Sequence, residues 1–468
     1  MIGASKNAPS YDNNHLLSLN LNVFYKTFLY DLYCLVGPLQ DVISTCCHRN
    51  SNSTTGPRMA AVNMSACYSA VCADHEIEIN PHVKEVLEKT TLTGTGVTIK
   101  LPGNSRRGNA QRLDDDDVLA LSKCLRNNKS VTGEQEMEDA LHQILLLVIS
   151  HMTDIVDPSV VTEQDDSSSL RSLDLMFNDI RGAGAEVLAR SLQCNSTLLS
   201  LRLSGNKIER RGAAHLASVL QVNSTLRELE LADCDLDTQG VMALAVALGS
   251  NETLLSVDLS RPLLPSLQEE WAVHASEMLA ANGGLLELHL GKMGMGDAGM
   301  ERLSAGLRLN GSLRYLDLRC NRVTRDGVRH LSELLKQSRT LQVVDLSSNR
   351  IEDEGAAYLS EGVAWPGCVL RELSVRSNHV GTEGLLSLAQ ALMASTALSH
   401  LYIWGNRLEE PVCQVFGEMI ASGRLPPSRT DVSAYEADGR TFLAEAFRGL
   451  RRRRFGADVD TFPCDASM

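Results

Sequence analysis

From Leu170 onward, one pattern of apolar and polar residues repeats about every 28 residues. In each copy the two kinds of residue first alternate, and apolar residues then recur every three or four positions. The clearest copies are residues 170–180 (LRSLDLMFNDI), 198–208 (LLSLRLSGNKI) and 341–351 (LQVVDLSSNRI). The alternating part predicts a short strand, whose side chains point to opposite faces in turn. Small and apolar residues then lie three and four positions apart, which predicts a helix: Gly184, Ala185, Leu188, Ala189 and Leu192. Each unit therefore predicts one strand followed by one helix.

These units are leucine-rich repeats, and their length with a full helix resembles the ribonuclease-inhibitor-like family. We predict an α/β fold, a leucine-rich-repeat solenoid shaped as a horseshoe, with parallel strands on the concave face and helices on the convex face. One unit cannot bury its apolar side alone, so stability must come from stacking. The predicted units begin at Leu170, Leu198, Leu226, Leu254, Leu285, Leu313, Leu341, Leu370 and Leu398.

An asparagine follows most of the predicted strands. We expect Asn178 and its equivalents to bond backbone groups of neighbouring coils, which would otherwise be buried without partners. Cys234, Pro262 and Met293 replace it in three units, and only the cysteine is a usual substitute. The unit at Leu254 is also three residues longer than most. We interpret this as an inserted loop, while a functional site there remains an alternative.

The repeat pattern divides the chain into six segments. Residues 132–169 carry no strand signature, so we expect them to cap two exposed apolar ends of the solenoid or, as a splice variant, to compromise the fold. The segments are an atypical N-terminal extension expected to be disordered (1–58), an N-terminal cap with a degenerate repeat (59–131), an irregular interruption (132–169), nine repeats (170–425), a C-terminal cap (426–450) and a basic tail (451–468).

The two predicted caps have their own signals. Ile99, Leu101 and Asn104 reproduce a degenerate strand and turn. Asp114–Asp117 then begin a helix, whose dipole favours acids in its first turn, and we prefer this to metal binding. At the other end we expect four apolar residues to form the capping core: Val432, Tyr435, Phe442 and Leu443.

Composition narrows the function further. The 468 residues carry a formal charge of −14, which disfavours non-specific nucleic-acid binding. The twelve cysteines show no metal-ligand spacing, and we expect free thiols. The sequence has no segment long enough to span a bilayer, and no diagnostic catalytic order. We therefore predict a non-enzymatic protein without cofactor or metal. Glycosylation sequons at Asn195, Asn223, Asn251 and Asn310 share one repeat position and are expected to be a by-product of the repeat.

The register identifies the side chains of the concave face, because the residues flanking the inward leucines must point outward. The central positions form an acidic stripe, which predicts a basic protein partner. At its C-terminal end, aromatic residues resemble interface anchors, although Trp404 alternatively packs on the cap. The predicted protein-binding residues are Asp174, Glu228, Glu230, Asp258, Glu287, Asp317, Asp345, Glu372, Tyr402 and Trp404.

An arginine run near the C-terminus is the strongest cationic cluster of this acidic chain. Such runs act as nuclear or nucleolar targeting signals or contact nucleic acid, and they also occur as solvated helix ends. The candidate targeting residues are Arg448, Arg451, Arg452, Arg453 and Arg454.

Four runs carry a more specific resemblance: 175–180 (LMFNDI), 259–264 (LSRPLL), 314–327 (RYLDLRCNRVTRDG) and 401–408 (LYIWGNRL). They resemble a vertebrate family of leucine-rich-repeat proteins, from which residues 1–58 and 132–169 depart. The resemblance implies a non-enzymatic protein of the nucleus, nucleolus and cytoplasm of stem and germ cells. It implies roles in pluripotency and ribosome biogenesis, with nucleophosmin and nucleolin as partners and no membrane association.

Two other functions use the same repeat type. Ribonuclease inhibitors present an acidic concave face to a basic enzyme, but they are far richer in cysteine and have no interruption. A Ran-type GTPase-activating protein typically ends in an acidic tail, whereas this chain ends in arginines. Both remain alternatives to the interaction scaffold that we predict.

Overall fold

The computed structural model describes only residues of the unit Met59–Met468. The extension 1–58, the interruption 132–169 and all five candidate targeting arginines lie outside the described residues. The described residues are 64–74, 77–89, 97–103, 112–124, 170–193, 195–265, 269–446 and 450.

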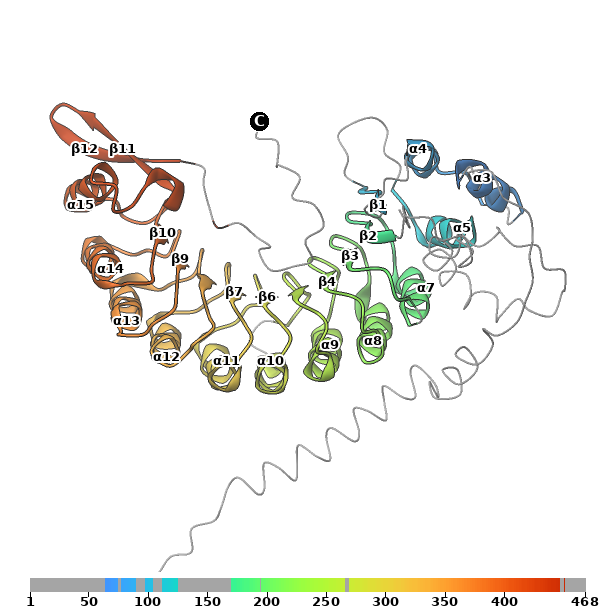
Figure 1. Ribbon diagram of the computed structural model, residues 1–468, viewed down its shortest axis with the longest axis horizontal. Coiled ribbons are helices and arrows are strands. Elements are labelled where there is room, and N and C mark those ends of the chain that lie inside the picture. Colours follow the sequence, from blue (N-terminus) through green and yellow to red (C-terminus); the bar gives the residue numbers. More distant parts are fainter. Residues whose placement is uncertain are drawn as a thin grey trace, which may run out of the picture. The chain divides into compact units, whose positions relative to one another are not determined.

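Ten strands form one parallel sheet in which the spatial order equals the chain order. This confirms the predicted α/β leucine-rich-repeat solenoid, and Figure 1 shows the strands on the inner side of the curved array. The strands are β1 (Val97–Lys100), β2 (Leu170–Asp174), β3 (Ser200–Arg202), β4 (Glu228–Glu230), β5 (Ser256–Asp258), β6 (Glu287–His289), β7 (Tyr315–Asp317), β8 (Val343–Asp345), β9 (Glu372–Ser374) and β10 (His400–Tyr402).

Each strand of the repeats is followed by a helix on the outer side (Figure 1). Neighbouring helices pack closely because small residues face the adjacent coil; a Cβ at Gly306 would lie 2.2 Å from the backbone oxygen of Ser276. The helices are α7 (Gly182–Leu192), α8 (Glu209–Leu220), α9 (Thr238–Ser250), α10 (Glu270–Ala281), α11 (Asp297–Leu309), α12 (Arg325–Leu335), α13 (Glu352–Ala364), α14 (Thr382–Ala394) and α15 (Glu410–Ala421).

The turn asparagines form the predicted ladder between coils. The buried Asn206 donates from Nδ2 to the carbonyl oxygens of Leu175, at 2.8 Å, and Leu203, at 2.7 Å. Its Oδ1 accepts a bond from the amide of Ile180 at 3.1 Å. In the next coil Cys234 takes this place, with its Sγ 3.1 Å from the oxygen of Leu203. Equivalent bonds reach the preceding coil from Asn178, Asn321, Asn349, Asn378 and Asn406.

A second asparagine ladder occupies the sequon position. Asn223 is 5% exposed, and its Nδ2 bonds the oxygens of Leu192 at 2.7 Å and Asn195 at 3.0 Å. Asn251 repeats the arrangement one coil later, with the oxygens of Leu220 and Asn223. The side-chain amide of these residues therefore bonds the preceding coil, a role that the sequence pattern did not predict.

The expectation that the interruption exposes two apolar ends is wrong. Strand β1 pairs directly with β2, with Ile99 beside Leu173, although residues 125–169 separate the two coils in the sequence. The amide of Leu101 donates to Asp174 at 2.9 Å, and Asn178 returns a bond to the oxygen of Leu101 at 2.7 Å. The degenerate coil thus stacks on the first regular one, and the strand order of the sheet is unbroken.

Within the described residues, two helices precede β1, α3 (Met64–Asp74) and α4 (Pro81–Lys89), and α5 (Asp115–Cys124) follows it. The predicted acidic helix start is confirmed. Asp114 and Asp117 bond each other's backbone amides at 2.9 and 3.2 Å, which caps the helix. Asp117 also accepts bonds from Asn80 at 3.0 Å and Tyr68 at 3.3 Å. The acids therefore connect the first helices of this unit.

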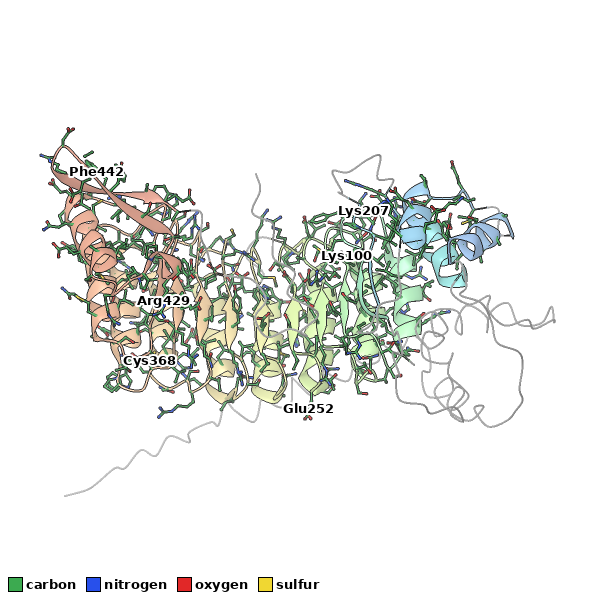
Figure 2. All side chains as sticks on the ribbon, turned by 45° about the horizontal axis from the view of Figure 1, so that its top comes forward. Lys100, Lys207, Glu252, Cys368, Arg429 and Phe442 are labelled. Carbon is green, nitrogen blue, oxygen red and sulfur yellow. The ribbon has the colours of Figure 1, made fainter. Side chains whose placement is uncertain are left out.

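The C-terminal cap is a hairpin of β11 (Val432–Ala437) and β12 (Arg440–Glu445) that packs on α15. It follows a short 3-10 helix, Pro427–Arg429. Val432 and Leu443 are buried as predicted, at 0% and 8% exposure. Tyr435 and Phe442 are not: they are 51% and 40% exposed and stack on each other, with ring centroids 5.7 Å apart. Figure 2 shows Phe442 on this hairpin, beyond the last repeat. Hairpin side chains alternate between faces, so only one of each neighbouring pair can contact α15.

Candidate protein-binding site

Two rows of side chains run along the inner face of the sheet, because every strand pairs with the next in the same register. We call them the acidic rows. The first contains Ser172, Ser200, Glu228, Ser256, Glu287, Tyr315, Val343, Glu372 and His400; the second contains Asp174, Arg202, Glu230, Asp258, His289, Asp317, Asp345, Ser374 and Tyr402. The register thus brings together nine of the ten predicted binding residues, and Trp404 lies two residues beyond the end of the second row.

Exposure along the rows differs from the expectation of a solvent-facing stripe. Asp174 and Asp258 are half-buried. The other six carboxylates are almost fully buried, at 0% to 6% exposure: Glu228, Glu230, Glu287, Asp317, Asp345 and Glu372. A carboxylate removed from water requires hydrogen bonds and counter-charges nearby, so the surroundings of each decide its behaviour.

Arg202 sits among three carboxylates at the N-terminal end of the rows. Its guanidinium nitrogens lie 3.8 Å from Asp174, 3.7 Å from Glu228 and 3.5 Å from Glu230. Glu228 also accepts a bond from Ser200 Oγ at 2.8 Å. Among the described contacts, Arg202 is therefore shared by three carboxylates at this end of the rows.

His289 is the centre of a second cluster, and it is 2% exposed. Its Nδ1 lies 3.3 Å from Asp317 and its Nε2 lies 3.6 Å from Glu287. Burial lowers the pKa of His289, but hydrogen bonding to Asp317 and Glu287 and the charge of Asp258 outweigh it and raise the pKa to about 9. The histidine is therefore a cation at neutral pH.

Asp317 and Asp345 have opposite pKa shifts although they are neighbours in the second row. Burial raises the pKa of Asp317, but His289 and Arg319 more than compensate and hold it below its usual value. Burial and the charge of Asp317 raise the pKa of Asp345, which bonds only Ser347 among the contacts described. Asp345 is thus a carboxylate that an added cation would stabilise.

The aromatic end of the face is more closed than expected. Tyr402 is 3% exposed, so the prediction of an exposed aromatic anchor is wrong for this residue. Its ring stacks on His400 with centroids 6.4 Å apart. Trp404 is half-buried, and its backbone amide donates to Asp431 of the cap at 3.1 Å. Tyr315 is fully buried in the first row, next to the ring of His289.

Residues of the cap complete this end, and the repeat pattern did not indicate them. Arg376, two residues after β9, lies 3.2 Å from Asp431 and 2.5 Å from Glu445. Asp431 also accepts the amide of Ile403 at 2.9 Å. Burial raises the pKa of Asp431, and the bonds from Ile403 and Trp404 and the charge of Arg376 act in the opposite direction. The sequence signal for this contact was limited to the position of Asp431, directly before the strand that begins at Val432.

Within the described residues, no group of three or more histidine, cysteine, aspartate or glutamate side chains is arranged to hold a metal ion. No described helix is long and apolar enough to cross a membrane. The arrangement on the inner face offers carboxylate oxygens and two cationic side chains, Arg202 and His289, at sheet spacing.

A family model described as Leucine Rich repeat matches residues 166–189, 194–217, 222–245, 310–332, 337–360 and 368–389. The chain is also similar to three curated proteins named leucine-rich repeat-containing protein 34. The mouse protein (Mus musculus) is 49% identical over 201 residues, which cover 43% of this chain and 48% of the relative. The human protein (Homo sapiens) is 51% identical over 200 residues, 43% of each chain. The rat protein (Rattus norvegicus) is 48% identical over 199 residues, 42% of this chain and 48% of the relative. The chain thus spans less than half the length of each of these relatives.

Proposed function

We propose that this chain, which contains leucine-rich repeats and is similar to leucine-rich repeat-containing protein 34, is an interaction scaffold whose acidic rows bind an arginine-rich segment of a partner protein. The observation that carries the proposal is the register of the sheet. It places eight carboxylates in two rows on β2 and β4 to β9, interspersed with Arg202, His289 and uncharged residues, on strands that lie about 4.8 Å apart. They are Asp174, Glu228, Glu230, Asp258, Glu287, Asp317, Asp345 and Glu372.

The burial of these carboxylates favours arginine over lysine in the partner. A guanidinium is weakly hydrated and bonds carboxylates with two parallel donors, whereas an ammonium strongly retains its water. The protein itself already uses arginines at this face: Arg202 and Arg319 contact row carboxylates. In an extended partner segment, arginines at every second residue would all point to the same side, toward the rows.

Neutralising three carboxylates of the rows is expected to weaken binding of a fluorescent arginine-rich peptide at least tenfold. The variant is Asp174→Asn, Asp258→Asn and Glu372→Gln, which keeps side-chain shape while removing charge. Tenfold corresponds to about 1.4 kcal/mol, a modest loss for two half-buried charges and one almost fully buried charge. Fluorescence anisotropy of the full chain measures it, and a lysine peptide of equal charge should bind more weakly than the arginine peptide.

A matched variant removes three exposed carboxylates from the outer helices: Glu301→Gln, Glu333→Gln and Glu383→Gln. It changes the net charge equally and should leave the affinity within about twofold, because charges beyond a Debye length of about 8 Å are screened. Equal losses in the two variants would mean that the peptide senses only total charge, and the proposal of a concave-face site would be abandoned.

We further propose that the scaffold acts in the nucleus and nucleolus as well as the cytoplasm, in pluripotent cells and in ribosome biogenesis, with nucleophosmin and nucleolin as candidate partners. The sequence resemblance and the arginine run support this location. Replacing Arg451–Arg454 by alanine in the full chain is expected to shift it from the nucleolus to the cytoplasm, as fluorescence microscopy would show. If the alanine variant remains nucleolar, the arginine run is not the targeting signal.

A further inference from the structure

The acidic rows contain more negative than positive charge within the described strands. Eight carboxylates face Arg202 and His289 in the rows, and Arg319 and Arg376 two residues beyond the second row. Arg376 is engaged outside the rows, since it pairs with Asp431 and Glu445 of the cap. The face therefore attracts further cations.

The described chain before the arginine run reaches this face at Ala446. Strand β12 ends at Glu445, whose carboxylate contacts Arg376 beside β9, and the amide of Ala446 donates to the oxygen of Asp431 at 2.8 Å. These contacts fix the point from which the rest of the chain continues. It lies at the C-terminal end of the rows, not on the outer helices.

The distance from this point to the central carboxylates is short. Arg451 follows Ala446 by five residues, and an extended chain of that length spans about 18 Å. Strands of a sheet lie about 4.8 Å apart, so this length crosses between three and four strands from β9. Arg454 extends the reach to about 29 Å. The carboxylates of β5 to β8 are therefore within reach: Asp258, Glu287, Asp317 and Asp345.

We propose that the run Arg451–Arg454 binds the acidic rows of its own chain and competes there with the partner's arginine-rich segment. This rests on the proposed function of the rows as a binding surface for arginine, and it adds a regulation of that surface. A segment tethered by five residues has a local concentration in the millimolar range. A partner must therefore bind much more strongly than an isolated short peptide, or it must bind while the run is engaged elsewhere.

The test compares the full chain with a variant in which Arg451–Arg454 are changed to alanine. If the run occupies the rows, the variant binds the fluorescent arginine-rich peptide at least tenfold more tightly than the parent. Hydrogen exchange of residues 447–468 in the parent is slowed, and a variant with Asp258→Asn and Asp345→Asn, two of the carboxylates within reach, loses that protection. Hydrogen exchange followed by mass spectrometry measures the protection of residues 447–468 directly, independently of peptide binding.

A matched control removes four exposed arginines from the outer helices: Arg210, Arg302, Arg308 and Arg329 to alanine. It lowers the net charge by the same amount and should change peptide affinity by less than twofold. Equal tightening in both variants would show a general charge effect and overturn the intramolecular contact. Unchanged affinity with no protection of residues 447–468 would overturn it as well.

The two proposals fail separately. If the peptide binds neither chain while residues 447–468 remain protected in a manner that depends on the row carboxylates, the intramolecular contact stands and the partner site is refuted. If the peptide binds both chains equally and through the rows, the partner site stands and the competition is refuted. Binding of a single-stranded RNA to the parent, lost in the alanine variant and unaffected by the row substitutions, would assign the run to nucleic acid and overturn the competition.

Discussion

Replacing Asn206 with alanine is expected to lower the free energy of unfolding by about 4 kcal/mol. The side chain is 1% exposed and satisfies three backbone groups, the oxygens of Leu175 and Leu203 and the amide of Ile180. Alanine leaves all three buried without these partners, and each unsatisfied group costs about 1–3 kcal/mol. Because coils stabilise one another only through their neighbours, the loss extends to the interface between β2 and β3.

Two variants distinguish this cause from general damage to the turn. Asn206→Cys should lose clearly less stability than alanine, since Cys234 already occupies the equivalent position with its Sγ 3.1 Å from a carbonyl oxygen. Lys207→Ala changes the exposed neighbouring side chain, labelled in Figure 2, and should be nearly neutral. Urea unfolding followed by circular dichroism measures all three. A loss below about 1 kcal/mol for alanine, equal to that of the lysine variant, would contradict the ladder's energetic role.

The repeat register could be predicted in detail because it rests on period and stacking alone. Leu201 and Leu229 point into the core, and Arg202 and Glu230 point to the concave face, because side chains alternate along a strand. The asparagine ladder was predictable for a similar reason, since the same backbone groups recur in every coil. Structural features that recur in every coil can be predicted from a single sequence, because the residues that form them recur at the same repeat position.

The continuity of the sheet from β1 to β2 was not predictable in this way. Residues 125–169 separate the two coils in sequence, and the local pattern does not indicate that Ile99 and Leu173 pair. A long excursion costs little in loop entropy, which grows only slowly with length, while direct stacking buries two apolar coil faces. The energetic balance therefore favours pairing across the gap, a comparison that a search for strand signatures cannot make.

Burial on the inner face was the second feature that the sequence could not supply. Register predicted that Glu287 and Asp317 face the same side, but not that each has an exposed fraction of 0%. Exposure depends on what the long side chains of neighbouring strands cover, such as Tyr315 and Arg319. Likewise Asp431 and Glu445 belong to a cap outside the repeat, so their pairing with Arg376 had no periodic signal.

Replacing His289 with glutamine is expected to lower the free energy of unfolding by about 3 kcal/mol at pH 6. The folded pKa of about 9 lies above the ordinary value of 6.5, because the bonds to Asp317 and Glu287 and the charge of Asp258 outweigh the effect of burial. Each pKa unit corresponds to about 1.4 kcal/mol. Glutamine keeps hydrogen bonding but removes the cation that balances carboxylates almost fully removed from water.

The same shift predicts how stability depends on pH. Since the pKa is higher in the folded than in the unfolded chain, the contribution of His289 is fully present below pH 6.5. It decreases as the pH rises from there and is lost once the pH passes about 9. The parent should therefore lose stability relative to the glutamine variant over this window, and the two unfolding curves should approach each other near pH 9.5.

His330→Gln provides the control, because this half-buried histidine lies on the outer helix α12, away from the acidic rows. Its stability should follow that of the parent at every pH. Chemical denaturation at pH 6, 7, 8 and 9.5 gives the full comparison. A constant difference between parent and His289→Gln across this range would mean that the ring contributes shape and hydrogen bonds but no charge. In that case the acidic rows would be more negative at neutral pH than proposed, and their attraction for a basic segment would be correspondingly stronger.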